Sequence, residues 1–204
     1  MRYLSMRRLF QLCALGVLST LSACAQPTKN SAPVSLMPAA PAQPGNETLI
    51  LASGCFWGTE YFLKRIDGVV ATTVGYTGGH VENPSYQEVC TKKTGHYEAC
   101  LVEYDPSRTT AETVLRMFFE THDPTQRNGQ GPDIGPQYRS AVFYQTEAQR
   151  ELTASLIEQL RAKGYDVATE LLPAAPFYSA EGYHQDYYDV KGGTPYCHGY
   201  RKLF

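Results

Sequence analysis

The order of strand-like and helix-like segments after Thr48 limits the fold of this chain more than any other feature of its sequence. Runs typical of strands lie at 48–52, 69–76, 97–104 and 140–145, with an edge strand at 166–174 closed by Pro173. Helical periodicity lies at 57–66, from 109 and from 146. This order predicts an α+β fold, a two-layer, ferredoxin-like sandwich of helices packed on a mixed or antiparallel sheet.

Two helix starts are marked by side chains. Thr109 with Glu112 and Thr146 with Gln149 fit capping boxes, and the second helix should end at Gly164. The expected buried stripes are Val114, Leu115, Phe118 and Phe119 in the first helix, and Leu152, Leu156, Ile157 and Leu160 in the second. After 174 the pattern is irregular, with one helix expected at about 181–191 in a tail without other regular structure.

The first 23 residues resemble a bacterial secretory signal. Arg2, Arg7 and Arg8 precede an apolar stretch that is too short for a permanent membrane span. This stretch ends in LSAC, which resembles a lipobox, so we expect cleavage before Cys24 and lipidation of its thiol. An ordinary cleavage site followed by a cysteine is the alternative. A thioether lipid and an acyl chain together would hold the protein on a membrane surface.

Residues 24–47 are rich in Pro, Ala and Ser and have no apolar period, which predicts a flexible, lipid-anchored linker. We therefore expect one folded domain at 48–204. Removal of 1–23 leaves 15 basic and 20 acidic side chains, a net charge of −5, which argues against nucleic acid and electrostatic membrane binding. Ala25 follows Cys24 where an aspartate would favour the inner membrane, so we expect the periplasmic side of the outer membrane.

Four cysteines belong to the expected domain: Cys55, Cys90, Cys100 and Cys197. In an exported protein they could form two structural disulfides, with three possible connectivities, or they could include redox-active thiols. No two of them have a C-x-x-C spacing, which excludes a thioredoxin-type motif and a zinc knuckle. Cys100 lies within a strand pattern and is expected in the core.

Cys55 stands where an apolar strand gives way to a helix, in GCFWGTE. The first backbone N–H groups of a helix favour a thiolate, and a thiolate is the nucleophilic form of cysteine. Two long polar segments that carry aromatic residues, 75–90 and 123–140, are candidates for functional loops. By itself, a cysteine beside aromatic rings is more often an inert core residue than a nucleophile.

Eight motifs in this order resemble the peptide-methionine (S)-S-oxide reductases, the A-type methionine sulfoxide reductases: GCFWGTE, GYTGG, NPSYQEVC, TGHYEACLVEYDP, HDPTQ, GPQYRSAVFY, PFYSAEGYHQDY and PYC. The resemblance extends from about Thr48 to Phe204. It implies thiol-dependent reduction of methionine S-sulfoxide in proteins, without a metal or an organic cofactor. Whether the free amino acid is also reduced is left open by the sequence.

Residue by residue, the resemblance implies the following site. The catalytic positions match Cys55, Glu98, Tyr86, Asp133, Tyr138 and Cys197, and the wall around the substrate methyl group matches Phe56 and Trp57. Cys55 would be the nucleophile, Glu98 the acid and Cys197 the resolving thiol. The S-epimer selectivity is likewise implied by the resemblance, since each sulfoxide epimer has its own enzyme type.

The chemistry itself demands a proton donor beside the thiol. A sulfoxide sulfur becomes electrophilic when its oxygen is protonated, so Glu98 must carry a proton while Cys55 ionises. An apolar cage that keeps the carboxyl neutral serves both groups, and the two should titrate as a coupled pair. Hydroxyls of Tyr86 and Tyr138 could donate further hydrogen bonds to the oxygen.

Attack leaves a sulfenic acid on Cys55, which a second thiol must convert to a disulfide. Cys197 is the expected partner because it lies in a glycine-rich segment near the C-terminus, and Cys90 is the alternative. The tail after Cys197 has no further cysteine, which favours a two-cysteine relay. His96 and His184 are expected to be hydrogen-bonded structural imidazoles.

The sequence therefore predicts a lipid-anchored, extracytoplasmic reductase that repairs oxidised exported proteins. Full turnover by Cys55→Ser would contradict this prediction. A thioredoxin-like dithiol protein on the same side of the membrane would reduce its disulfide, and the enzyme is expected to be monomeric. A binding lipoprotein that holds methionine-like side chains on the same fold is the alternative. A general thiol-disulfide oxidoreductase is less favoured because a C-x-x-C motif is missing.

Overall fold

The computed structural model describes residues 42–204. The predicted signal peptide at 1–23, the predicted lipid-anchor Cys24 and most of the predicted linker at 24–47 lie outside the described residues. The elements in chain order are β1 (Glu47–Ser53), α1 (Phe56–Leu63), β2 (Val69–Thr77), α2 (Tyr86–Cys90), β3 (Tyr97–Tyr104), α3 (Ala111–Glu120), β4 (Gly129–Gln130), β5 (Asp133–Ile134), η1 (Pro136–Tyr138), β6 (Ser140–Tyr144), α4 (Glu147–Ala162), β7 (Glu170–Pro173), β8 (Phe177–Ser179), η2 (Gly182–His184) and α5 (Tyr187–Lys191).

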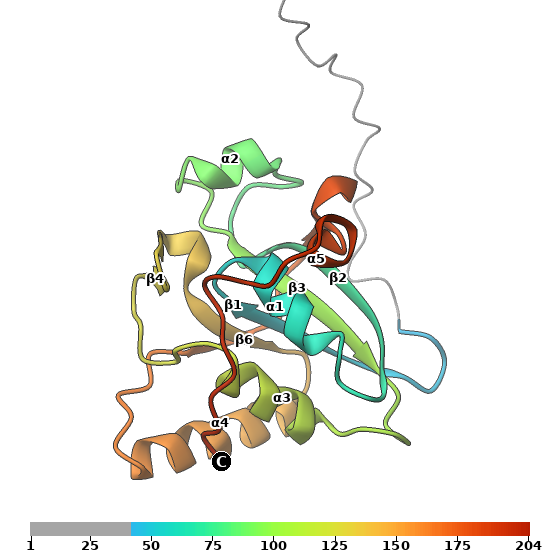
Figure 1. Cartoon of the computed structure of the whole chain (residues 1–204), viewed down its shortest axis with the longest axis vertical. Helices are drawn as coiled ribbons and strands as arrows, with labels where there is room; N and C mark the ends of the chain where they lie inside the picture. Colours follow the sequence, from blue (N-terminus) through green and yellow to red (C-terminus); the bar gives the residue numbers. More distant parts are fainter. Residues whose placement is uncertain (1–41) are drawn as a thin grey trace, which may run out of the picture. The chain divides into compact units, whose positions relative to one another are not determined.

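Six strands form one mixed sheet in the order β7-β6-β1-β3-β2-β8, and β4 pairs with β5 separately. Each pair of neighbours among the four central strands is antiparallel, whereas the edge strand β7 runs parallel to β6. With α1 after β1 and α3 after β3, the central order β6-β1-β3-β2 is that of a ferredoxin-like sandwich. The predicted α+β fold is therefore confirmed (Figure 1).

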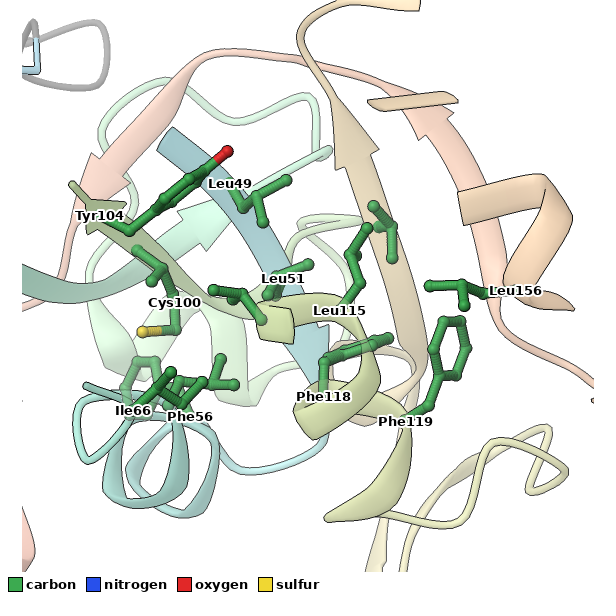
Figure 2. Close-up of a cluster of buried hydrophobic side chains, with 14 of the residues drawn as sticks. Leu49, Leu51, Phe56, Ile66, Cys100, Tyr104, Leu115, Phe118, Phe119 and Leu156 are labelled. Carbon is green, nitrogen blue, oxygen red and sulfur yellow. The ribbon is translucent and has the colours of Figure 1, made fainter. Parts of the chain in front are cut away.

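The main core lies between the sheet and three helices. Leu49 and Leu51 of β1 meet the stripes of α3 and α4 there, and Cys100 is buried among them as predicted (Figure 2). The predicted stripe of α3 is fully buried, because its four members repeat at the helical period. Ile50 and Ala52 of β1 point to a second, smaller cluster on the other face. β1 is thus buried on both faces, as its unbroken apolar run requires.

Two local predictions were wrong in detail. The N-cap of α3 is Thr110, whose hydroxyl accepts from Thr113 N–H, whereas Thr109 is buried and its own N–H bonds to Asp105 in the preceding turn. The helix expected at 181–191 is divided into η2 and α5, because Asp186 has φ +55° and interrupts it. The predicted cap Thr146 of α4 is observed.

The C-terminal tail runs from α5 past α1 to the ends of α3 and α4 (Figure 1). It is fixed by backbone hydrogen bonds from Gly199 to Thr121 and from Arg201 to Glu120. The Glu120 carboxylate also accepts from the backbone N–H of Leu203 at 2.9 Å. These bonds bring the segment around Cys197 to the start of α1.

Candidate active site

Cys55 is the N-cap residue of α1 and is buried at the turn after β1. Gly54 has φ +101°, and a Cβ there would come 2.4 Å from Gln130 Cβ, so this turn requires glycine. The carbonyl of Cys55 accepts the first helical hydrogen bonds, from Gly58 and Thr59. The thiol is therefore held at the helix start, as the sequence predicts.

Cys197 lies against Cys55, and the two thiols share a hydrogen bond. This bond is the largest cause that raises the pKa of Cys55 well above its usual range, followed by burial and the charge of Glu98. The same bond, supported by His198, lowers the pKa of Cys197 to about 6. The N–H of Trp57 at the helix start acts on Cys55 in the opposite direction and lowers its pKa, but this contribution is smaller.

Glu98 lies on β3 and is 1% exposed. Its Oε2 accepts from the backbone N–H of Phe56 at 3.2 Å, which places the carboxyl at the first turn of α1. Burial raises the pKa of Glu98 to about 8, against a smaller lowering by that hydrogen bond. At neutral pH the carboxyl is mostly protonated. The arrangement thus supplies the proton donor that the sequence-based chemistry requires.

Tyr86 begins α2 and Tyr138 ends η1, so each comes from one of the two long segments predicted to be functional loops. Both side chains are half-buried, and burial is the main cause that raises the pKa of both hydroxyls. The charge of Glu98 contributes to both shifts, and for Tyr86 the neighbouring Cys90 contributes more. Both hydroxyls keep their protons at neutral pH and are available as hydrogen-bond donors.

Asp133, on β5, accepts a hydrogen bond from the hydroxyl of Tyr196 at 3.1 Å. Within residues 42–204, the donor atoms of Asp133, Cys55 and Cys197 form a group in which all lie within 4.8 Å of one another, a spacing that a metal ion could bridge. Two of the three are the coupled thiols described above.

The aromatic wall is formed by buried Phe56 and half-buried Trp57. The indole N–H of Trp57 donates to Nδ1 of His184 at 3.1 Å, and its ring stacks on Tyr187 at 3.7 Å with an interplanar angle of 7°. His184 is thus a hydrogen-bonded imidazole, as predicted, and its hydrogen-bond donor is Trp57 of the aromatic wall. The orientation of Trp57 is fixed from two sides by the segment 182–191.

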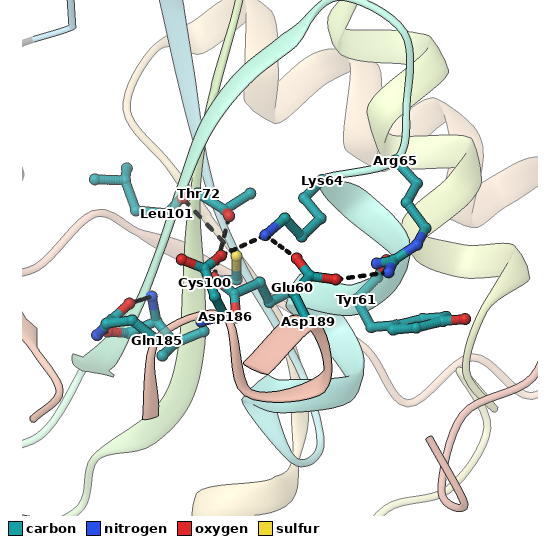
Figure 3. Close-up of polar contacts among 11 residues, drawn as sticks. Glu60, Tyr61, Lys64, Arg65, Thr72, Cys100, Leu101, Gln185, Asp186 and Asp189 are labelled. Carbon is teal, nitrogen blue, oxygen red and sulfur yellow. Dashed lines mark hydrogen bonds and ion pairs between the residues drawn. The ribbon is translucent and has the colours of Figure 1, made fainter. Parts of the chain in front are cut away.

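A polar clamp holds this segment against α1 and β2 (Figure 3). Buried Glu60 accepts from the hydroxyl of Thr72 at 3.1 Å and from the backbone N–H of Asp186 at 2.9 Å. Lys64 forms ion pairs with Asp186 and Asp189. Burial raises the pKa of Glu60, with the charge of Asp186 acting in the same direction. The clamp therefore fixes the backbone that carries the supports of Trp57.

The sequence interpretation missed two residues beside the reacting groups. Tyr196 bonds to Asp133, and His198 places its Nδ1 3.2 Å from Cys197 Sγ. Both flank Cys197 in the printed sequence, and this adjacency is the signal that could have identified them. Cys90 is exposed at the end of α2, and the four cysteines of the described residues are free thiols. His96 accepts from the N–H of Gly79 and contacts the carbonyl of Val81, as a structural imidazole does.

Among the described residues, no helix is both long and apolar enough to span a membrane.

Comparison with known proteins points to one family. The family model described as peptide methionine sulfoxide reductase matches residues 47–203. The peptide methionine sulfoxide reductase MsrA 1 of Rhodopirellula baltica is 48% identical over 156 residues, which cover 76% of this chain and 81% of that protein.

Two solved structures from Saccharomyces cerevisiae share the fold. Mxr1 in reduced form matches with a TM-score of 0.76 and 36% identity, covering 82% of this chain and 99% of Mxr1. Mxr1 in complex with Trx2 matches with a TM-score of 0.56 and 27% identity, covering 82% and 99%. The chain belongs to the peptide methionine sulfoxide reductase family, of the MsrA type, and is an oxidoreductase that carries out thiol-dependent reduction of methionine sulfoxide.

Proposed function

We propose that Cys55 attacks the sulfur of methionine S-sulfoxide while Glu98 protonates its oxygen. The observation that supports this most directly is the pair of coupled thiols beside a carboxyl whose pKa burial raises to about 8. The thiolate of Cys197 lies where it can accept the Cys55 proton as the sulfur attacks. The products are methionine, a sulfenic acid on Cys55 and a protonated Cys197, so protons and charge balance once Glu98 has given up its proton.

The oxygen of the substrate receives its remaining hydrogen bonds from Tyr86 and Tyr138. Each bond is worth ~1 to 3 kcal/mol where water is excluded. The methyl group packs against Trp57 and Phe56, and the Asp133 carboxylate lies beside both sulfur atoms. With the oxygen and methyl positions fixed, one epimer presents its sulfur to Cys55, and we assign this to the S epimer from the family resemblance.

Cys197 then attacks the sulfenic sulfur of Cys55, which forms the disulfide and releases water. The contact between the two thiols in the reduced protein means that little movement is needed for this step. Cys90, the alternative resolving thiol, is exposed at the end of α2. It lowers the pKa of neither Cys55 nor Cys197. We therefore assign the relay to Cys55 and Cys197.

A thioredoxin-like dithiol protein would reduce the disulfide and regenerate the pair. The Mxr1 structure in complex with Trx2 supports a partner of this class. We further propose that the chain is exported, lipidated at Cys24 and held as a monomer on the periplasmic side of the outer membrane, where it repairs oxidised exported proteins. The basic start, the short apolar stretch and LSAC in the sequence support this location. The reductant must then lie on the same side.

Single-turnover reduction of separated S and R epimers of a methionine sulfoxide peptide tests the mechanism. Thiols are counted before and after in wild type, Cys197→Ser and Cys90→Ser. We expect S-epimer reduction with loss of two thiols in wild type and Cys90→Ser, and of one in Cys197→Ser. Methionine formation by Cys55→Ser would contradict the proposed nucleophile, and loss of the second thiol in Cys197→Ser would move the resolving role to Cys90.

The location is tested separately by expressing the full chain in a diderm bacterium. Membrane fractionation and the mass of the mature N-terminal peptide should show a lipidated Cys24 in the outer membrane, and Cys24→Ser should release the protein from it. A Cys24→Ser chain that stays in the membrane fraction would contradict the lipid anchor.

A further inference from the structure

His198 lies directly on the backbone of α1, between the reacting thiols and a chain of hydroxyl groups. The residue is buried, and a Cβ at Gly58 would come 2.2 Å from its Nδ1, so the imidazole occupies the space that a side chain would need there. The second glycine of the GCFWG motif is therefore required for this ring to reach Cys197 Sγ, which lies 3.2 Å from Nδ1.

The hydroxyl chain fixes which ring nitrogen carries the proton. The Thr59 hydroxyl donates to the carbonyl of Cys55, which can only accept. Thr59 must then accept from the Ser53 hydroxyl, 2.8 Å away, and this leaves Ser53 to accept from Nε2–H of His198 at 3.4 Å. Nδ1 of His198 thus presents its lone pair to the thiol of Cys197.

We infer that His198 is the general base of the second step, the one that forms the disulfide. This inference rests on the proposed roles of Cys55 and Cys197. After the first step Cys197 carries a proton, and this proton moves to Nδ1 of His198 as the Cys197 sulfur attacks. The new S–S bond forms while the S–O bond of the Cys55 sulfenic acid breaks. The departing hydroxide and the proton from His198 together make one water, and the imidazole ends neutral.

The need for a base at this step follows from what oxidation removes. In the reduced pair the Cys55 S–H is the main group that lowers the pKa of Cys197, and His198 is the next. Conversion of Cys55 to a sulfenic acid eliminates that S–H donor. Of these two groups, only His198 can then still favour ionisation of Cys197.

Few other groups titrate around the ring between pH 6 and 10. Cys55 and Cys197 face it from α1 and the tail, and His122 interacts with it from the end of α3. Burial lowers the pKa of His122 to about 3, so this group stays neutral throughout the range. Asp133 acts on Cys197 from β5, and Glu98, with a pKa of about 8, interacts with it from β3; both remain in every variant below.

The test is a rapid-quench single turnover of the full-length chain in detergent with the S epimer of a methionine sulfoxide peptide. Methionine release and loss of the Cys197 thiol are followed separately, by chromatography and by alkylation with mass spectrometry. For His198→Gln at pH 7 we expect the rate constant of disulfide formation to fall at least about tenfold relative to that of methionine release. The difference should shrink toward pH 10, where Cys197 ionises without a base. His80→Gln, at an exposed histidine away from the thiols, serves as the matched control.

The outcomes separate the inference from the proposed function. Equal disulfide rates in wild type and His198→Gln at pH 7 would overturn the role of His198 and leave the relay intact. Absence of methionine from wild type would instead contradict the nucleophilic role of Cys55. Because methionine release requires an intact site, it also reports whether His198→Gln is folded. Ser53→Ala provides a second variant, which should slow disulfide formation by loss of the acceptor for Nε2–H.

Discussion

Replacement of Glu98 by glutamine should stabilise the protein at alkaline pH while it slows catalysis. Glu98 is buried and has a pKa of about 8, against 4.5 for an ordinary glutamate. Because the folded state holds this proton more tightly than the unfolded chain, the stability that the group contributes is complete below pH 4.5. It is lost as the pH rises from 4.5 through about 8. Glutamine has nearly the same shape and does not titrate.

The size of the effect follows from the two pKa values. Each factor of ten in proton affinity is worth ~1.4 kcal/mol, so the loss amounts to roughly 3 kcal/mol at pH 7 and roughly 5 kcal/mol above pH 9. The free energy of unfolding of Glu98→Gln, relative to wild type, should rise by this amount between pH 4.5 and pH 9. Methionine release should fall by a factor of about 10² because the general acid is lost.

Urea unfolding of both proteins with excess reductant at pH 4.5, 7 and 9 measures the difference directly. Other titrating groups are present in both chains, so subtraction removes most of their contribution. A difference between wild type and Glu98→Gln that stays constant over this range would refute the claim that burial holds a proton on Glu98. In wild type, the rate of methionine release should also decline as the pH rises through about 8.

Three further predictions concern the groups around the thiols. Absorbance of the thiolate at 240 nm should show one thiolate forming near pH 6 in the reduced protein, and Cys55→Ala should move this transition to higher pH because Cys197 loses its main hydrogen-bond donor. Glu60→Ala should lower the free energy of unfolding in urea by about 1 to 3 kcal/mol, since the Thr72 hydroxyl and the backbone N–H of Asp186 lose their shared acceptor. Gly58→Ala should slow disulfide formation in a single turnover, because its methyl group would occupy the place of the His198 ring.

The order of elements could be predicted because each depends on a few consecutive residues. The central strand at 48–52, the strand at 97–104 and the cap Thr146 follow from local apolar runs and a hydroxyl that bonds a nearby N–H. The helix expected at 181–191 could not be placed correctly in this way. The N–H of Asp186 bonds to Glu60 of α1, and this distant contact interrupts the helix.

The candidate residues could be named from motifs, but the effect of one thiol on the pKa of the other could not. The sequence indicates a thiol at a strand-to-helix turn, where the local helix N-terminus alone favours a thiolate on Cys55. The tail then brings a second thiol against it, which raises the pKa of Cys55 and lowers that of Cys197. For Glu98, the chemistry of sulfoxide reduction predicted a protonated carboxyl, and burial raises its pKa to about 8.

The sequence by itself determined the segments, the buried stripes and the set of residue types available for thiol chemistry, because these depend on neighbours along the chain. Tertiary structure alone decided that the Cys197 thiol lies against Cys55, how far burial raises the pKa of Glu98, and that His198 faces Cys197 across the backbone of Gly58. These properties depend on burial and on groups brought together from β1, β3, α1 and the tail. Burial and through-space contacts of this kind arise when the chain packs, and local sequence does not encode them.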